Sequence, residues 1–216
     1  MTEIKYEEKR LAKSGQTKKL VIMLHGVGSN SNDLISLADY LNLNQYTTYL
    51  SPNAPYEYDM APTGYQWFSL RDYSEKVLYS AISQEAHILD KYIDEKLNEY
   101  NLEPKDLIVL GFSQGSMIAL YQIPRRHRPI NAIIAISGAL FNPAALKEEQ
   151  KSKPDIFLIH GDRDQVVPFA AFNDAIKNLK QFEFKCNEFV MVGTGHNIST
   201  LALSKIESFL KERDFI

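Results

Sequence analysis

Four short runs of apolar residues are the clearest pattern in this sequence. Each run is four or five residues long and is followed by glycine, either directly or after one polar residue. They occupy residues 20–24, 107–110, 132–136 and 156–159. An uninterrupted apolar run that ends at glycine is typical of a strand covered on both faces, as in a parallel sheet. The alternative, a buried helix, needs longer runs than these.

Helical patterns lie between the predicted strands. Apolar side chains recur every three or four positions in residues 34–41, 78–100 and 198–210. This alternation of strands and helices predicts an α/β fold with a mostly parallel, doubly wound sheet. The length of 216 residues favours a single domain over residues 1–216. Ligands bind beyond the carboxyl ends of the strands in such sheets, so the polar residues after each apolar run are functional candidates.

The longest irregular stretch is predicted at residues 51–74. Its aromatic residues are Tyr56, Tyr58, Tyr65, Trp67, Phe68 and Tyr73. Long loops in compact domains are usually functional or disordered, and the aromatic content argues against disorder. Only residues 139–153 separate two later strands, which leaves no room for a large lid domain.

Composition narrows the class of protein further. The chain is 44% hydrophobic and 24% charged, as in soluble globular proteins. The net charge of -3 gives no attraction to nucleic acid, and we interpret the basic residues 125–128 as a solvated turn. Cys186 is the only cysteine, and we expect it to be inert packing. Residues 1–14 lack the apolar core of a secretory signal, and no run reaches the roughly 18 residues of a membrane span. We therefore expect a cytoplasmic protein without a transmembrane segment.

A serine motif follows the second apolar run. Gly111, Ser113 and Gly115 form the pattern Gly-x-Ser-x-Gly between a predicted strand and an apolar helical segment. In this context the pattern predicts a nucleophile elbow, a sharp turn that exposes the serine hydroxyl while flanking glycines let neighbouring backbone pass close by. The helix that follows directs its N-terminal N–H groups at the site. The alternative is a tight glycine-rich turn with an incidental serine.

A serine nucleophile needs a base, which in turn needs a group that orients it. His196 is the best candidate for the base, because it lies in a glycine-flanked loop after a strand-like segment at residues 184–192. The remaining histidines fall in a predicted helix, in a charged turn, or directly before a glycine at a strand end: His87, His127, His25 and His160. We interpret these four as surface or structural residues.

Two carboxylates after the fourth apolar run, Asp162 and Asp164, are candidates for the orienting acid. An Asp-x-Asp pair is also compatible with a metal site, but no further cluster of carboxylate or histidine ligands accompanies it. The order Ser113, Asp164, His196 along the chain matches the serine, acid, histidine order of α/β-hydrolases.

An oxyanion hole is the remaining element that such a site requires. One backbone donor is expected at Gln114, directly after the serine, and the second at Val27, in the loop after the first apolar run. A phosphate-binding loop is the alternative for Gly26-x-Gly28, but the third glycine and the lysine of such loops are missing.

Together these segments resemble the phospholipase/carboxylesterase family of α/β-hydrolases, which includes acyl-protein thioesterases. The motifs that carry the resemblance lie at residues 24–28, 52–55, 111–115, 160–168 and 195–199. The resemblance implies Ser113 as nucleophile, His196 as base and Asp164 as orienting acid, with oxyanion donors at Val27 and Gln114. It also implies no metal, no organic cofactor, and a homodimer as a common state.

Two departures from the family pattern stand out. Ser116 occupies a position where the family often has glycine, and we expect this to affect helix packing alone. Residues 59–70 look more like bacterial esterase members than like eukaryotic thioesterases, which argues against protein depalmitoylation.

We therefore expect a serine esterase that cleaves carboxylic esters, lysophospholipids or thioesters through an acyl-enzyme. The alternatives are a short-chain carboxylesterase acting on small soluble esters, and a catalytically idle hydrolase fold used as a binding module. The predicted substrate-binding residues lie in the loop at residues 56–73: Met60, Tyr65, Trp67 and Phe68. Alternatively, Trp67 and Phe68 only pin this loop to the core. The expected partner is a small-molecule or lipid-like ester, not nucleic acid, and peripheral membrane contact is compatible with this substrate class.

Overall fold

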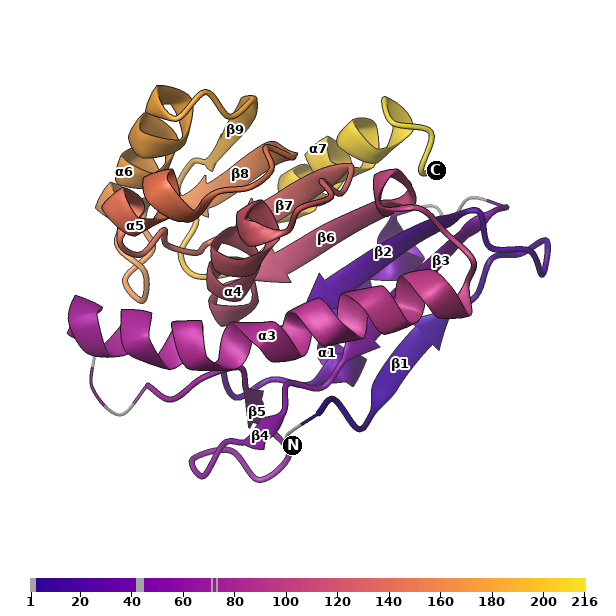
Figure 1. Ribbon diagram of the computed structural model, residues 1–216, viewed down its shortest axis with the longest axis horizontal. Helices are drawn as coiled ribbons and strands as arrows, with labels where there is room; N and C mark the ends of the chain where they lie inside the picture. The colour runs from indigo at the N-terminus through magenta and orange to yellow at the C-terminus, as the bar shows by residue number, and fades with distance from the viewer. Residues whose placement is uncertain (1–2, 42–44, 71, 73) are drawn as a thin grey trace.

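The computed structural model describes residues 3–41, 45–70, 72 and 74–216. These residues form a seven-stranded sheet in the order β1-β3-β2-β6-β7-β8-β9 (Figure 1). Neighbouring strands are parallel, except that β1 pairs antiparallel with β3 at one edge. The strands are β1 (Glu7–Arg10), β2 (Lys19–Leu24), β3 (Thr47–Pro52), β6 (Leu107–Phe112), β7 (Ala132–Ile136), β8 (Asp155–Gly161) and β9 (Cys186–Met191). The predicted fold class is thus confirmed.

The strand order reverses next to β2. The chain passes from β2 to β3 on one side, and later returns to β6 on the other side of β2. In open parallel sheets the ligand site lies outside the carboxyl ends of the strands at such a switch point. Residues that directly follow Leu24 and Phe112 therefore occupy the expected place of a site.

Helices cover both faces of the sheet (Figure 1). One face carries α3 (Glu75–Glu99), α4 (Gln114–Gln122), α5 (Pro143–Glu149) and α6 (Phe169–Gln181). The other face carries α1 (Ser31–Ile35), α2 (Leu37–Tyr40) and α7 (Thr200–Lys211), so the helix predicted at residues 34–41 is two short helices. Single 3-10 turns lie at Pro104–Asp106 and Ile123–Arg125. In the described segment between β7 and β8, α5 is the one helix, and there is no large lid.

Each face of the sheet has its own apolar core, which explains the uninterrupted apolar runs. Leu20 and Ile22 of β2 belong to the core under α3 and α4, while Val21 and Met23 belong to the core under α1 and α7. Because successive strand residues point to opposite faces, coverage on both sides favours apolar residues at every position.

Two strands of the seven-stranded sheet, β1 and β3, lack this apolar pattern and are missing from the sequence-based prediction. All six residues of β3 are buried, although several are hydroxyl-bearing. The Thr48 hydroxyl accepts a hydrogen bond from the Ala12 N–H at 3.1 Å, which compensates for its burial. The charged edge strand β1 is held by Glu7, which accepts a hydrogen bond from the Tyr92 hydroxyl and pairs with Lys96 at 2.8 Å on α3.

Residues 51–74 are also more regular than predicted. Their first two residues complete β3, and β4 (Tyr56–Glu57) pairs with β5 (Tyr65–Gln66) in a short hairpin. The hairpin is tied to the loop after β2, because the Gly28 N–H donates to the Tyr65 carbonyl and the Tyr65 N–H donates to the Ser29 carbonyl, each at 2.8 Å. Tyr73 lies outside the described residues. None of the described helices is both long and apolar enough to cross a membrane.

Candidate active site

Ser113 occupies a sharp turn between β6 and α4. Its backbone has φ 52° and ψ -116°, a strained conformation that non-glycine residues seldom adopt outside functional sites. The flanking glycines are sterically required. A Cβ atom at Gly115 would lie 2.0 Å from the Leu24 carbonyl oxygen, and one at Gly111 would lie 2.5 Å from the backbone of Gly115. This is the geometry of a nucleophile elbow, with the serine at the amino end of α4.

The loop after β9 brings His196 to this serine. The His196 Nε2 atom lies 3.0 Å from the Ser113 Oγ atom, and Nδ1 lies 2.7 Å from the Asp164 Oδ2 atom. A carboxylate only accepts hydrogen bonds, so Nδ1 carries the imidazole hydrogen and Nε2 is free to take the serine proton. The ring also packs against Phe112, with ring centroids 4.9 Å apart. The three residues therefore form one hydrogen-bonded chain.

Asp164 is held as a carboxylate by its surroundings. Its side chain is fully buried, and its Oδ1 atom accepts hydrogen bonds from the Val166 and Val167 N–H groups, each at 2.9 Å. Burial by itself would raise the pKa of this carboxyl, but the hydrogen bonds from His196, Val167 and Val166 outweigh it and lower the pKa below its usual value. Asp164 thus stays charged beside the imidazole.

The second candidate acid, Asp162, has a different position. Its Oδ1 atom accepts a hydrogen bond from the Gly193 N–H at 2.6 Å, in the loop that carries His196. Asp162 therefore supports the histidine loop, while Asp164 contacts the histidine. No group of three or more potential metal ligands occurs among the described histidine, cysteine and carboxylate residues.

The two predicted oxyanion donors both belong to segments next to the serine. Gly26, whose carbonyl belongs to the same peptide group as the Val27 N–H, packs so closely that a Cβ atom there would lie 3.2 Å from Ser113 Cβ. Gln114 is the first residue of α4, where a backbone N–H has no partner within the helix. In the described part of the chain, neither the Val27 N–H nor the Gln114 N–H donates to a protein acceptor.

The structure places the predicted substrate-binding residues in contrasting environments. Trp67 and Phe68 are fully buried, Tyr65 is half-buried, and Met60 is 82% exposed. The Gln114 side chain accepts a hydrogen bond from the Trp67 N–H at 2.8 Å and donates to the Phe68 carbonyl at 2.7 Å. These contacts match the alternative in which Trp67 and Phe68 pin the loop. The sequence did not predict these two hydrogen bonds of the Gln114 side chain, because nothing in the motif indicates where that side chain points.

The other two strand-end histidines are buried next to the site. His160 Nε2 lies 2.9 Å from the Val167 carbonyl oxygen and 3.4 Å from Asp164 Oδ2, so it supports the turn that holds the carboxylate. His25 lies directly after β2 and contacts the Trp67 ring, with centroids 5.7 Å apart. Burial lowers the pKa of both histidines, that of His25 to about 4, so both rings are neutral near pH 7.

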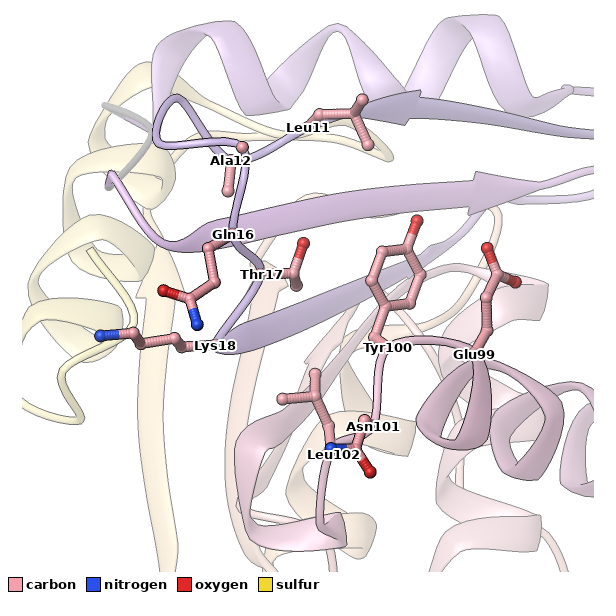
Figure 2. Close-up of a pocket in the computed structure, with 10 residues that line it drawn as sticks. Leu11, Ala12, Gln16, Thr17, Lys18, Glu99, Tyr100, Asn101 and Leu102 are labelled. Atoms are coloured by element: carbon pink, nitrogen blue, oxygen red, sulfur yellow. The ribbon is translucent and has the colours of Figure 1, made fainter.

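Other surface features lie away from Ser113. A hollow of about 600 Å³ opens between residues 11–18 and the end of α3 (Figure 2), at the amino ends of the strands and opposite the serine. The arginines at residues 125–128 are paired with carboxylates: Arg125 with Glu149, Arg126 with Asp90 and Asp94, and Arg128 with Glu103. Their charges are balanced, but the interpretation as a solvated turn is only partly right, because the Arg126 side chain is 7% exposed whereas that of Arg128 is 67% exposed.

A mostly parallel sheet with a serine elbow at its switch point defines the class of α/β-hydrolases. The model of the phospholipase/carboxylesterase family matches residues 8–213, and the chain belongs to this family. It is therefore a hydrolase of the carboxylesterase and thioesterase type.

Individual relatives agree with this assignment. Acyl-protein thioesterase 1 of Saccharomyces cerevisiae is 28% identical over 222 residues, which cover 93% of this chain and 95% of that protein. Carboxylesterase SOBER1 of Arabidopsis thaliana is 26% identical, with 91% of each protein covered. Among solved structures, esterase PE8 is similar with a TM-score of 0.92 and 34% identity, over 97% of this chain and 99% of that chain. The similarity extends over nearly the full length in each case.

Proposed function

We propose that this protein hydrolyses carboxylic esters by a serine mechanism, with Ser113 as nucleophile, His196 as general base and Asp164 as the acid that orients the imidazole. The observation that carries the proposal is the hydrogen-bonded chain from the Ser113 hydroxyl through both nitrogens of His196 to Asp164. The family and the names of the relatives support the reaction class.

The first half-reaction forms an acyl-enzyme. Ser113 Oγ attacks the ester carbonyl carbon while its proton passes to His196 Nε2, and the carbonyl π electrons move onto the oxygen. The Val27 and Gln114 N–H groups receive this oxyanion, aided by the positive amino end of α4. Collapse of the intermediate expels the alcohol, which takes the proton from His196.

The second half-reaction releases the acid. Water attacks the acyl-enzyme as His196 accepts its proton, a second oxyanion forms in the same hole, and Ser113 leaves with the returned proton. Asp164 keeps the Nδ1 hydrogen in place throughout and stabilises the imidazolium that forms twice per cycle. A thioester follows the same path with a thiol as leaving group.

Hydrolysis of p-nitrophenyl esters from short to long acyl chains tests this proposal. We expect wild-type turnover and its loss in Ser113→Ala. The matched control is Ser116→Ala, because this serine is buried one turn further along α4 and its hydroxyl has no hydrogen-bond partner among the residues that the structure describes. Comparable turnover by Ser113→Ala and wild type would refute the proposal. The chain-length optimum separates small soluble esters from lipid-like ones.

A further inference from the structure

The imidazole of His25 is held on both sides in a single tautomer. The Ala54 N–H donates a hydrogen bond to His25 Nε2 at 3.0 Å, so Nε2 carries no hydrogen. The hydrogen is therefore on Nδ1, which lies 2.7 Å from the Gly26 carbonyl oxygen and donates to it. The side chain is 0% exposed, which keeps water from competing for either bond.

The carbonyl that His25 holds belongs to the peptide group of the Val27 N–H. A trans peptide group is planar, and its C=O and N–H point in opposite directions. Fixing the direction of the oxygen therefore fixes the direction of the N–H. The same oxygen also accepts a hydrogen bond from the Ser29 N–H at 3.2 Å, and Gly26 packs against Ser113.

The surrounding bonds connect this peptide to the other oxyanion donor. The Trp67 indole N–H donates to the His25 carbonyl at 2.9 Å, and the Trp67 backbone N–H donates to the Gln114 side chain at 2.8 Å. His25 is thus the side chain in this network that acts on the Gly26–Val27 peptide itself, while the bonds of Trp67 hold the surrounding loop.

We propose that His25 is a positioning residue that holds the Gly26–Val27 peptide with its N–H directed at the oxyanion. This inference rests on the proposed function of the site. Without the Nδ1 donor, the Ser29 N–H at 3.2 Å is the one remaining hydrogen bond that the described residues make to this carbonyl, and glycine restricts rotation of the peptide least of all residues. Rotation would remove one donor and turn a carbonyl oxygen towards the developing negative charge.

Two substitutions test the two hydrogen bonds of the His25 imidazole separately. In His25→Asn the side-chain N–H₂ takes the place of Nδ1 and keeps a donor for Gly26. In His25→Gln the terminal oxygen takes the place of Nε2 and keeps an acceptor for Ala54, but the donor to Gly26 is lost. Each variant retains one buried hydrogen bond, which makes them a matched pair for stability.

We expect kcat for p-nitrophenyl butyrate to fall about 100-fold in His25→Gln, the lower range for loss of one oxyanion donor, and by less than about fivefold in His25→Asn. Equal turnover by the two variants would overturn the inference. Thermal unfolding of both variants, followed by circular dichroism, measures any general loss of structure.

The binding affinities of two ketones distinguish a role at the oxyanion from a purely structural role, which would affect both ketones equally. Ser113 Oγ adds to the carbonyl carbon of an alkyl trifluoromethyl ketone, the π electrons become an oxyanion, and the serine proton passes to His196. The methyl ketone of equal length occupies the site without this addition. We expect His25→Gln to bind the trifluoromethyl ketone about 100-fold more weakly and the methyl ketone as wild type does. An equal loss of affinity for both ketones would show a loosened pocket and contradict the inference.

The experiments also distinguish this inference from the proposed function. Turnover by Ser113→Ala would overturn both. Activity that depends on Ser113, combined with equal behaviour of the Asn and Gln variants, would overturn the role of His25 alone.

Discussion

Acidification should destabilise the protein through the burial of His25. Burial lowers the pKa of this imidazole from 6.5 to about 4, against the opposing effects of the Gly26 hydrogen bond and the charge of Asp33. In the unfolded chain the ring is hydrated and binds a proton below pH 6.5, whereas the folded protein resists protonation down to about pH 4. The unfolded state therefore holds more protons in this window, and the free energy of unfolding falls as the pH falls.

The magnitude follows from the separation of the two pKa values. Each pH unit between them is worth roughly 1.4 kcal/mol, so the loss approaches about 3 kcal/mol below pH 4. About 2 kcal/mol of this is lost between about pH 7.5 and pH 5. A typical domain has a free energy of unfolding of roughly 5–15 kcal/mol, so the effect is large enough to measure.

Urea unfolding followed by far-UV circular dichroism at a series of pH values measures this loss. His25→Gln is the control, because its side chain accepts the Ala54 hydrogen bond without titrating. Burial also lowers the pKa of His160, but this residue is present in both proteins and its contribution cancels in the comparison. The pKa of Asp164 is lowered below 3.8, so its protonation costs stability only below this window.

Between about pH 7.5 and pH 5, we expect the free energy of unfolding to fall by about 2 kcal/mol more in wild type than in His25→Gln. Parallel curves for the two proteins over this range would refute the reasoning, because they would mean that His25 binds its proton equally well in both states.

Three further predictions concern the site and its supports. Asp164→Asn should keep the fold but lower kcat by up to about 10⁴-fold, because an amide no longer holds the His196 tautomer; unchanged kcat would contradict this role. Trp67→Ala should lower the free energy of unfolding by about 3–5 kcal/mol in urea and leave the acyl-chain preference unchanged, whereas a shifted chain-length optimum would place Trp67 at the substrate. Burial raises the pKa of Cys186 to about 11, so its thiol should react with a disulfide reagent at neutral pH far more slowly in the native protein than in urea; equal rates would show that it is not protected.

Local pattern in the sequence was sufficient for most of the sheet and for the serine. Four of the central strands are uninterrupted apolar runs, because both of their faces are covered. Gly111 and Gly115 flank Ser113 because any side chain there would collide with backbone. Gly111, Ser113 and Gly115 lie within one short turn, so the motif remains visible in the sequence even though the backbone that Gly115 approaches belongs to Leu24.

Long-range contacts decided the features that no pattern revealed. β3 contains buried threonines and β1 is charged, and both are stabilised by partners far away in the sequence, such as Ala12 for Thr48 and Tyr92 for Glu7. Their hydrogen bonds compensate for polarity that, in isolation, predicts a loop.

Local pattern and long-range contacts also account for different residues of the candidate site. The residue pattern by itself predicted Ser113 and His196 for the site and left Asp162 and Asp164 as candidates for the acid, of which the family resemblance implied Asp164. The tertiary structure decided which carboxylate contacts the imidazole, since the loop after β9 brings Gly193 to Asp162 and His196 to Asp164. It also decided that His25 holds the Gly26 carbonyl. The direction of a single hydrogen bond depends on the packing of distant segments, which residue type and spacing do not encode.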